Sequence, residues 1–413
     1  MTPPQARGPA RPHIVLVTDQ FPTPSEPERG IFTFQIATRL ATLCRLTVVC
    51  PLPWFPAIPV LRRLRAWYRF AEVPRAWVQE GVRVIAPKYP MLPKLSEGLH
   101  GRLMAARLRP VLERLRRTEQ VDLINSHWLY PDGVAVHLAM GSAPLPHVPT
   151  GLGCDVNEFL DDPRKGPQIR AMLAAAPAVT VVSNELRARL IAQGVPADRI
   201  TTIPNGVDAT RFHLRDRAGA RRRLGLADDG AVVLYVGRLS EEKAPGTLIA
   251  AMARLRTTHP SAELLLAGDG PLRRSLLEQA RALGLADHVR FLGHQPHDHI
   301  AEWMAAADCL CLSSTREGCP NVVLEALASG VPVVATSVGD LPEVITPATG
   351  VLVPAGAPAA LADGLGTALD RDWDRLAIQR TVASRSWDGV ARAYLETFQR
   401  TLATRPAPTG GRA

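Results

Sequence analysis

Short runs of apolar residues alternate with longer amphipathic stretches through the second half of the chain. The runs have the length of strands buried on both faces, and apolar residues at helical spacing follow them. This pattern is typical of a parallel sheet covered by helices on both sides. A further helix is expected to have Pro271 at its first position. The predicted strands are Val232–Val236, Glu263–Ala267, Val289–Leu292, Cys309–Ser313 and Val331–Ala335, and the predicted helices are Gly246–Leu255, Ile300–Ala307 and Asn321–Ala328.

The first half repeats this alternation less regularly. A turn-rich stretch at 203–206 separates the two sets of elements, and a chain of 413 residues fits two domains better than one core. We therefore predict an α/β protein with domains at 13–202 and 203–385. The tails at 1–12 and 404–413 have little to bury and are expected to be disordered. The predicted strands of the first half are His13–Thr18, Leu46–Cys50, Val82–Ala86, Leu123–Ser126 and Val179–Ser183, and the predicted helices are Phe34–Leu43 and Arg102–Arg117.

Composition and cysteine usage suggest a location. Hydrophobic residues make up 46% of the chain, and the N-terminus lacks the apolar region of a signal peptide. No run reaches the roughly 18 apolar residues of a membrane-spanning helix. The 6 cysteines show no paired metal spacing. We expect a reduced cytoplasmic protein, either soluble or peripheral at the cytoplasmic face of the inner membrane.

The formal charge of +9 comes from one segment, because residues 61–117 hold 14 Lys or Arg and 4 Glu. Within it, residues 61–70 (LRRLRAWYRF) mix arginines with Leu, Trp, Tyr and Phe, as a helix lying on an anionic membrane does. A solvated helix face is the alternative interpretation. No nucleic-acid-binding motif accompanies the charge. We favour peripheral contact with an anionic membrane and expect no nucleic acid as a partner.

Glycines and cations follow the predicted strands, at the edge where open parallel sheets bind their ligands. Gly237 and Arg238 follow one strand, with Lys243 five residues on, and Gly268–Gly270 follow the next strand. Glycines let the backbone approach a ligand closely, and the predicted helix starting at Asn321 presents free N–H groups to an anion. Two cations beside such a helix form the pattern of a diphosphate site. A solvated surface turn is the alternative interpretation of Lys243.

Two carboxylates belong to the same region. Glu317 precedes the predicted helix and Glu325 lies one turn into it, so both side chains can face one cleft. One carboxylate can accept hydrogen bonds from sugar hydroxyls and the other from ribose hydroxyls. The alternative interpretation is that Glu317 is an ordinary charge at the start of a helix and Glu325 an ordinary surface residue. His294, His297 and His299 are interpreted as a polar surface loop, because no matching metal-ligand set accompanies them. We expect no metal site.

Residues 316–326 (REGCPNVVLEA) resemble the E-x7-E signature of family 4 retaining glycosyltransferases, with Glu317 and Glu325 as its glutamates. Ser386 and Trp387 resemble the start of a last helix, 386–403, which in these proteins crosses back to the N-terminal domain. Together these motifs make the resemblance highly specific over residues 203–387. Other segments that resemble the family, in order, are 203–208 (IPNGVD), 236–239 (VGRL) with Lys243, 267–272 (AGDGPL) and 330–336 (GVPVVAT).

The first half resembles the family more loosely. Residues 30–32 (GIF) are similar to its first glycine loop, with one glycine where many relatives have two. Residues 127–133 (HWLYPDG) and 153–157 (GCDVN) resemble members that build cell-surface polysaccharides. Three positions depart from the family pattern, one of which is Asp340 in place of a Gly before Pro342 and Glu343. Leu152 stands where many relatives have a His or Arg that touches the donor sugar, and Ala244 replaces the usual Gly after the lysine.

The resemblance implies the GT-B fold, in which two Rossmann-like domains face across a cleft. It implies retaining transfer of a sugar from a UDP- or GDP-linked donor to a hydroxyl of a glycan or glycolipid, with no metal ion and no cofactor besides the donor substrate. Arg238 and Lys243 are implied at the diphosphate, Glu317 at the donor sugar and Glu325 at the ribose. The implied set also includes Gly30, Gly268, Gly270, Gly318, Asn321 and Val322 for donor binding, His127 and Asp155 on the acceptor side, and Glu317, Lys243, Arg238 and His127 for catalysis.

Two other functions remain open on the sequence alone. A sugar-nucleotide epimerase of the same architecture would use the same diphosphate site without an acceptor, and the E-x7-E pattern argues against it. A non-catalytic sugar-nucleotide binder is the second alternative. The presence of Glu317, Arg238 and Lys243 together argues against that alternative.

Overall fold

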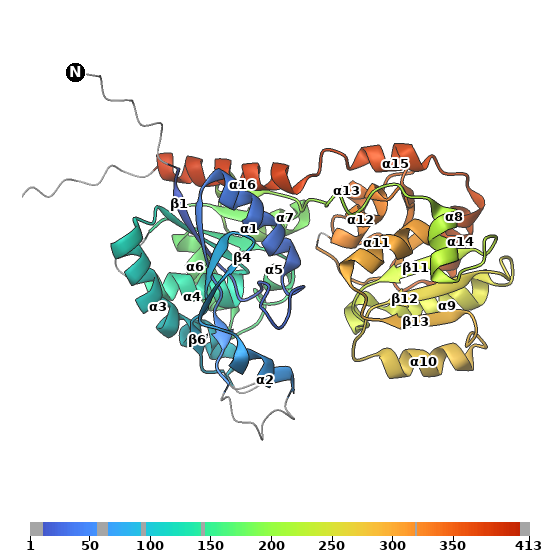
Figure 1. Ribbon diagram of the computed structural model, residues 1–413, viewed down its shortest axis with the longest axis horizontal. Coiled ribbons are helices and arrows are strands. Elements are labelled where there is room, and N and C mark those ends of the chain that lie inside the picture. The colour runs from blue at the N-terminus through green and yellow to red at the C-terminus, as the bar shows by residue number, and fades with distance from the viewer. Residues whose placement is uncertain (1–10, 56–64, 92–95, 142–144, 319, 405–413) are drawn as a thin grey trace, which may run out of the picture. The chain divides into compact units, whose positions relative to one another are not determined.

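The computed structural model describes residues 11–55, 65–91, 96–141, 145–318 and 320–404. The chain divides into two compact units, each with its own sheet (Figure 1): unit 1 comprises residues 1–204 and 387–413, and unit 2 comprises residues 205–386. The chain thus leaves unit 1 after Pro204 and returns to it at Trp387. Of the two predicted tails, residues 1–10 and 405–413 lie outside the described residues.

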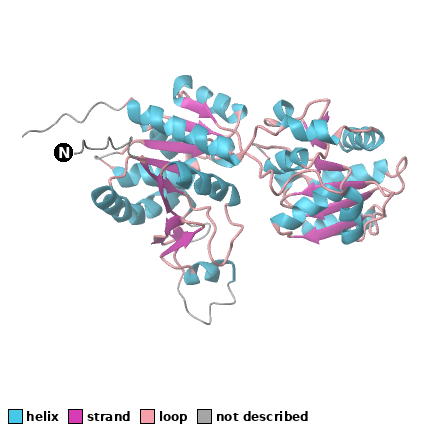
Figure 2. Ribbon diagram, turned by 45° about the horizontal axis from the view of Figure 1, so that its top comes forward, coloured by secondary structure: helices cyan, strands magenta, loops and turns pink. Residues whose placement is uncertain are grey.

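Unit 2 is built on a six-stranded parallel sheet in the order β13-β12-β11-β14-β15-β16. Helices lie on both sides of its strands (Figure 2), which explains why the strands are almost entirely apolar. The chain adds β12 and β13 on one side of β11 and the remaining strands on the other, which is a Rossmann order. The strands are β11 (Val232–Val236), β12 (Glu263–Ala267), β13 (Val289–Gly293), β14 (Cys309–Leu312), β15 (Val333–Thr336) and β16 (Gly350–Val353).

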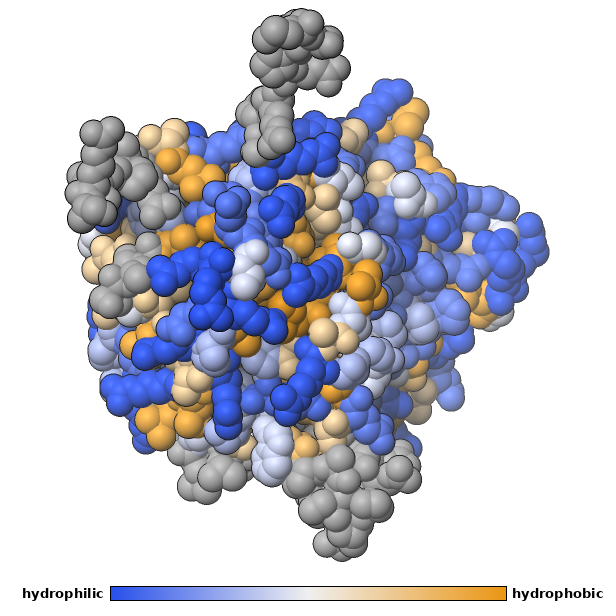
Figure 3. Space-filling view, turned by 60° about the vertical axis from the view of Figure 1, so that its left-hand side comes forward, coloured by the Kyte–Doolittle hydropathy of each residue, from blue (hydrophilic) through white to orange (hydrophobic). Residues whose placement is uncertain are grey.

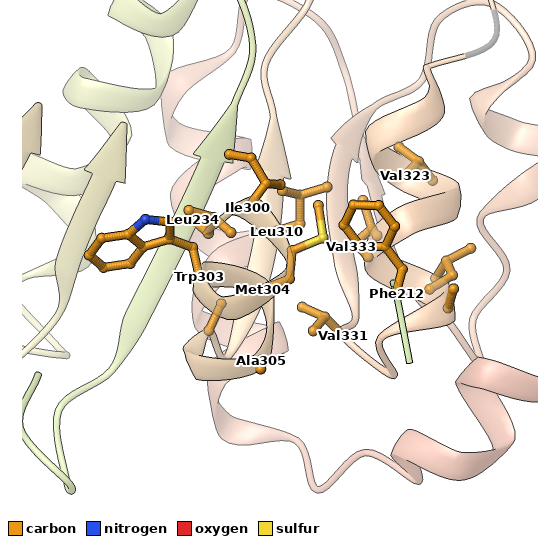
Figure 4. Packing of buried hydrophobic residues seen from close by; sticks show 14 of the residues in the cluster. Phe212, Leu234, Ile300, Trp303, Met304, Ala305, Leu310, Val323, Val331 and Val333 are labelled. Atoms are coloured by element: carbon orange, nitrogen blue, oxygen red, sulfur yellow. The ribbon is translucent and has the colours of Figure 1, made fainter. Parts of the chain in front are cut away.

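Two hydrophobic clusters cover the opposite faces of this sheet. Successive residues of β11 alternate between them, because Leu234 belongs to one cluster and Val233 and Tyr235 to the other. Figure 4 shows the first cluster, in which Met304 and the fully buried Phe212 pack beside the strands. The helices that supply these clusters are α8 (Arg217–Leu224), α9 (Pro245–Leu255), α10 (Arg273–Ala282), α11 (His297–Ala306), α12 (Asn321–Ala328), α13 (Leu341–Val344), α14 (Pro358–Asp370) and α15 (Arg375–Thr381).

Unit 1 contains an eight-stranded sheet in the order β10-β9-β8-β7-β1-β2-β5-β4. All neighbours pair in parallel except β4 and β5, which are antiparallel. The order again reverses beside the first strand, between β1 and β7. The strands are β1 (His13–Val17), β2 (Arg45–Val49), β4 (Ala76–Gln79), β5 (Val82–Ile85), β7 (Leu123–His127), β8 (His147–Gly151), β9 (Val179–Val181) and β10 (Ile200–Thr202), and β3 (Leu52–Pro53) and β6 (Lys88–Tyr89) form a separate pair.

The last helix, α16 (Trp387–Ala403), belongs to unit 1 and packs on its first helix. Trp387, Tyr394 and Phe398 are buried in a cluster that also holds residues of β1, β7 and β8. No helix within the described ranges is long and apolar enough to span a membrane. The other helices of unit 1 are α1 (Ile31–Leu43), α2 (Arg65–Glu72), α3 (His100–Glu119), α4 (Val134–Met140), α5 (Cys154–Asn157), α6 (Gly166–Ala175) and α7 (Asn184–Ala192).

The predicted start of α10 was wrong. The helix begins at Arg273, and Pro271 lies in the turn before it. The N–H of Leu272 donates to the carbonyl oxygen of Leu239 at 3.1 Å, so this turn is tied to the loop after β11 instead of opening the helix.

The helix predicted from Ile300 was also placed too late. It begins at His297, because the carbonyl oxygen of Pro296 already accepts from the N–H groups of His299 and Ile300. The strand predicted from Val331 instead begins at Val333, since the Val331 N–H closes the end of α12 by donating to Ala326 at 2.9 Å.

Candidate functional site

The candidate residues of unit 2 gather where its strand order reverses. β11 and β14 are neighbours in the sheet, but the chain continues from their carboxyl ends to opposite sides. Such a switch point is where open α/β sheets bind ligands. Arg238 and Lys243 lie on the loop after β11, and Glu317 lies on the loop after β14. The site therefore arises from the strand order, before any side chain is considered.

Lys243 and Glu317 form the central ion pair of this site. The Nζ atom of Lys243 lies 2.7 Å from both carboxylate oxygens of Glu317, and the Glu317 side chain is only 5% exposed. The hydroxyl of Ser314 donates to the same carboxylate at 2.6 Å. Hydrogen bonds to charged groups are roughly twice as strong as neutral ones, so these contacts hold Glu317 in one orientation. The structure thus brings the two loops together through these side chains.

Backbone contacts hold the two loops in register. The Ser313 hydroxyl donates to the carbonyl oxygens of Lys243 and Ala244 at 3.1 and 2.9 Å. The Thr315 N–H donates to the carbonyl oxygen of Glu242 at 2.8 Å. Ala244 has a φ of 44°, in the left-handed region that costs a non-glycine residue about 1–2 kcal/mol. This conformation explains why glycine is the usual residue at the position where this chain has Ala.

Glu325 is held by a residue that the sequence analysis placed in a surface loop. The Nε2 atom of His297 lies 2.9 Å from Oε1 of Glu325, whose side chain is 8% exposed. The interpretation of His297 as a polar loop residue was therefore wrong, because it starts α11 and faces α12. His294 and His299 are exposed, but His299 also lies within α11, so the loop interpretation was wrong for that residue too. The sequence did contain a signal for His297. Of the three histidines, it is the one nearest the apolar face of the helix that follows, which indicates a side chain facing the protein.

The glycines predicted to bind the sugar donor allow the loop after β12 to touch the loop after β11. A Cβ on Gly268, whose φ is +146°, would overlap the carbonyl oxygen of Gly237, and one on Gly270 would overlap that of Leu239. The Gly237 N–H donates to Ala267 at 3.0 Å, which joins the ends of β11 and β12. Gly268 and Gly270 must therefore be glycines for a reason internal to the protein, because they let the loop after β12 hold the loop that carries Arg238.

The other residues implied in binding the sugar donor lie around the Lys243–Glu317 pair. The Arg238 side chain is exposed, while its carbonyl oxygen accepts from the Tyr235 hydroxyl at 2.9 Å. Asn321 is the first residue of α12, and its Oδ1 atom is buried without a hydrogen-bond partner within the described part of the chain. Val322 is partly buried against the first hydrophobic cluster, and Gly318 is half-buried. No group of three or more His, Cys, Asp or Glu within the described residues is arranged to hold a metal ion.

In unit 1, Gly30 caps the start of α1 with a φ of +60°. A Cβ there would overlap the backbone at Gln20 and lie 2.8 Å from the N atom of Phe21. The glycine is thus required by the close approach of the chain after β1, whether or not a ligand binds beside it.

His127 ends β7, beside the reversal of strand order in unit 1. It is fully buried, and its Nδ1 atom lies 3.1 Å from the Thr33 hydroxyl of α1. Its Nε2 atom has no hydrogen-bond partner among the described residues. Burial lowers the pKa of His127 to about 3, so the imidazole is neutral at physiological pH. The structure therefore places a neutral imidazole with one unpartnered nitrogen in the interior of unit 1.

Asp155 does not present its carboxylate to an acceptor in the structure. It is fully buried, and its oxygens accept hydrogen bonds from the backbone N–H groups of Leu129, Leu152, Gly153 and Val156 at 2.8–3.3 Å. Burial raises the pKa of Asp155, and these hydrogen bonds oppose the shift. In the structure Asp155 joins the loop after β7 to the loop after β8, and its implied role on the acceptor side stays a prediction.

A second buried carboxyl, Asp132, was not singled out from the sequence. Both of its oxygens are buried without a hydrogen-bond partner within the described residues. Burial raises the pKa of Asp132 well above its ordinary value, and the nearby Asp19 carboxyl raises it further. Burial also raises the pKa of Asp19, which Arg29 partly offsets. Asp132 entered the sequence analysis only as part of the HWLYPDG segment, and nothing in that segment indicated that its carboxyl would be isolated from solvent.

Both halves of the chain match models of glycosyltransferase families. Residues 216–383 match Glycosyl transferases group 1, and residues 30–211 match Glycosyltransferase Family 4. A putative teichuronic acid biosynthesis glycosyltransferase, TuaC of Bacillus subtilis, is 30% identical over 360 residues, which cover 85% of this chain and 88% of that protein. A D-inositol 3-phosphate glycosyltransferase of Nocardia farcinica is 35% identical over 332 residues, or 74% of each chain.

Solved structures agree with this assignment. Sucrose-phosphate synthase from Thermosynechococcus elongatus superimposes with a TM-score of 0.77 at 23% identity, covering 96% of this chain and 100% of that one. HepE of Anabaena, solved with UDP, has a TM-score of 0.71 at 23% identity, covering 94% and 100%. The architecture of this protein is therefore the GT-B glycosyltransferase fold. Within that class, the chain belongs to the group 1 glycosyltransferases of family 4.

The raised pKa of Asp132 predicts a pH-dependent stability. Above about pH 4, the unfolded chain releases this proton while the folded protein keeps it, so stability falls as the pH rises toward the folded-state pKa. Asparagine cannot ionise, so Asp132→Asn should raise the melting temperature at pH 8 relative to the wild type by more than it does at pH 5. Thermal melts at both pH values check this, with the exposed Asp372→Asn as control. Parallel shifts at the two pH values would contradict it.

Proposed function

We propose that the protein is a retaining glycosyltransferase that moves a sugar from a nucleotide-diphosphate donor to a hydroxyl of a glycan or glycolipid. The observation that carries the proposal is the pairing of Lys243 with Glu317 at the switch point of unit 2, with Glu325 on the adjoining helix. This arrangement offers cations for a diphosphate and carboxylates for sugar hydroxyls at one edge of the sheet. The membership in a family of glycosyltransferases supports the same chemistry.

The proposed reaction breaks the bond between the anomeric carbon and the diphosphate oxygen, and the electron pair leaves with the diphosphate. The acceptor oxygen forms the new bond on the same face of the sugar, and its proton passes to an oxygen of the departing diphosphate. The barrier is dominated by charge developing on that diphosphate, which pre-aimed donors stabilise efficiently. Arg238, Lys243 and the N-terminus of α12 supply those donors without a metal ion.

The two glutamates take different parts in this proposal. Glu317, fixed by Lys243 and Ser314, accepts from hydroxyls of the donor sugar, and Glu325 accepts from hydroxyls of the ribose. When a diphosphate arrives, Lys243 can divide its three N–H donors between the phosphate and Glu317. The same side chain therefore positions the sugar-binding carboxylate and neutralises the leaving group.

The relatives suggest where the donor and acceptor should be sought. HepE of Anabaena was solved with UDP, and TuaC is described as a putative teichuronic acid biosynthesis glycosyltransferase. We propose a UDP-linked donor first and a GDP-linked donor second, with a surface-polysaccharide precursor as acceptor. The role of His127 on the acceptor side rests on the family resemblance alone, because its neutral imidazole, Nε2 atom included, is buried inside unit 1.

Peripheral contact with an anionic membrane, on the cytoplasmic face, completes the proposal. Arg107, Pro110, Val111 and Arg114 share one face of α3, and they line a hollow whose other walls include cations and a 56%-exposed Trp54. Hydrophobic and hydrophilic residues interleave on the side of the molecule that Figure 3 turns forward. Cations around an apolar floor suit lipid headgroups. Of the predicted basic segment, residues 61–64 and 92–95 lie outside the described residues. The other cations of the hollow are Arg75, Arg83 and Lys88.

The first prediction from this proposal concerns the nucleotide. UDP should raise the melting temperature of the full chain, with or without EDTA, whereas ADP should not. A ligand at 100 times its Kd adds about 2.7 kcal/mol of stability, which is enough to shift the midpoint by several degrees. A thermal-shift panel of UDP, GDP and ADP measures this. No shift with any of the three would argue against a donor site, and a shift lost in EDTA would argue against metal independence.

The second prediction concerns Lys243. Lys243→Ala should lower kcat by at least ~100-fold, because a donor aimed at the developing charge is removed. Glu241→Ala, an exposed carboxylate in the same turn, is the matched control and should stay within about threefold of the wild type. Release of the nucleoside diphosphate from the donor, measured with each variant, is the readout. A loss of less than threefold in Lys243→Ala would remove this residue from the reaction.

The third prediction concerns the membrane. The wild type should sediment with phosphatidylglycerol vesicles at low salt and not with phosphatidylcholine vesicles. The double variant Arg107→Gln/Arg114→Gln should bind at least about tenfold more weakly, because each cation near an anionic surface contributes about 1 kcal/mol. Arg254→Gln/Arg274→Gln removes the same charge from exposed positions of unit 2 and serves as control. Equal loss in both variants, or no sedimentation of the wild type, would refute membrane contact through α3.

A further inference from the structure

We propose that His297 is a positioning residue of the donor site, which holds the Glu325 carboxylate in the orientation that receives the ribose. The inference rests on the proposed function for the role of Glu325. It adds a residue outside the E-x7-E segment, together with the side chains that orient it. The carrying observation is a continuous chain of side chains from Arg211 through His297 to Glu325.

The direction of the hydrogen bonds determines which nitrogen of His297 carries the proton. The Nη1 atom of Arg211 lies 2.9 Å from Nδ1 of His297, and a guanidinium can only donate. Nδ1 must therefore accept, so a neutral His297 carries its proton on Nε2. That N–H points at Oε1 of Glu325, 2.9 Å away. Arg211 thus selects the tautomer that can donate to the carboxylate.

Packing restricts the imidazole as well. Its ring meets the ring of Phe212 edge-on, with the centroids 5.1 Å apart, and Phe212 is 1% exposed within the first hydrophobic cluster. Arg211 is anchored in turn by a 2.8 Å contact from its Nε atom to Asp298, the residue that follows His297 in α11. The ring is consequently held by a buried aromatic residue on one side and by a tethered guanidinium on another. A side chain restrained in this way loses little further freedom when it orients a partner.

The two glutamates of the site are held by different means. Glu317 forms an ion pair with the ammonium group of Lys243, whereas one oxygen of Glu325 accepts a hydrogen bond from the Nε2–H group of His297. A neutral donor leaves the negative charge on the Glu325 carboxylate for a ligand hydroxyl. His297 therefore fixes the geometry of the carboxylate without neutralising it, as a group that accepts from ribose hydroxyls requires.

This arrangement predicts a particular kinetic effect. A ribose contact is present equally in the bound donor and in the transition state, so losing it raises KM and leaves kcat nearly unchanged. His297→Phe keeps a ring against Phe212 and removes both hydrogen bonds. We expect the Kd for UDP, or for GDP if that nucleotide stabilises the wild type, to rise about ten- to a hundredfold, the usual effect of a hydrogen bond to a charged group. The donor KM should rise in step, with kcat within about threefold.

Three further variants separate positioning from structural support. His299→Ala removes an exposed histidine from the same turn of α11 and should leave the Kd unchanged. His297→Gln, which keeps a side-chain N–H, should restore part of the affinity lost in His297→Phe. In a Glu325→Gln background, His297→Phe should add less than threefold, because two residues acting through one contact are not additive. Melting temperatures without ligand show whether each variant is folded.

The outcomes distinguish this inference from the function on which it rests. If the wild type binds neither UDP nor GDP by calorimetry, both fail. If the wild type binds and His297→Phe binds equally well, only the role of His297 is refuted. A fall in kcat at constant KM, or full additivity with Glu325→Gln, would also refute it. A raised Kd with unchanged kcat and no added effect in the Glu325→Gln background would establish it.

Discussion

The architecture of unit 2 depends on one constraint, the reversal of strand order beside β11. Because every connection in a parallel sheet must cross a face, two neighbouring strands whose chains leave in opposite directions open a gap between their following loops. β11 and β14 are those strands, and their loops carry Lys243 and Glu317. The strand order thus determines the position of the site, and the side chains of the two loops determine its chemistry.

Close backbone contact then makes the loops stiff enough to hold charges. The glycines after β12 let that loop touch the loop after β11, and the Ser313 hydroxyl ties the latter to the end of β14. Three loops are consequently joined, and at Gly268 and Gly270 the contacts leave no room for a Cβ. In unit 1, Asp155 serves the same purpose with one carboxylate, by accepting from two loops at once. The two units thus fix the loops that follow their strands by different chemistry, through close backbone approach at glycines in unit 2 and through a buried carboxylate in unit 1.

The sequence predicted the strands of unit 2 well, because buried parallel strands are continuous apolar runs with little ambiguity. β11 and β12 begin and end at the predicted residues. It was weaker where contacts between distant segments decide the outcome. Nothing local marks Leu272 as tied to Leu239, or β8 as a strand when it contains a proline and ends in glycine. The E-x7-E segment identified both glutamates, yet their partners, His297 among them, come from other segments and depend on the tertiary fold.

The return of α16 to unit 1 has a consequence for how the protein is made. A ribosome delivers the chain from the N-terminus, so all of unit 2 emerges before the helix that covers β1, β7 and β8. Until Tyr394 and Phe398 arrive, unit 1 exposes the apolar surface that they will cover. Unit 2 is contiguous and can complete its core during synthesis. The nascent first unit, in contrast, keeps part of its apolar core exposed until α16 has been synthesised.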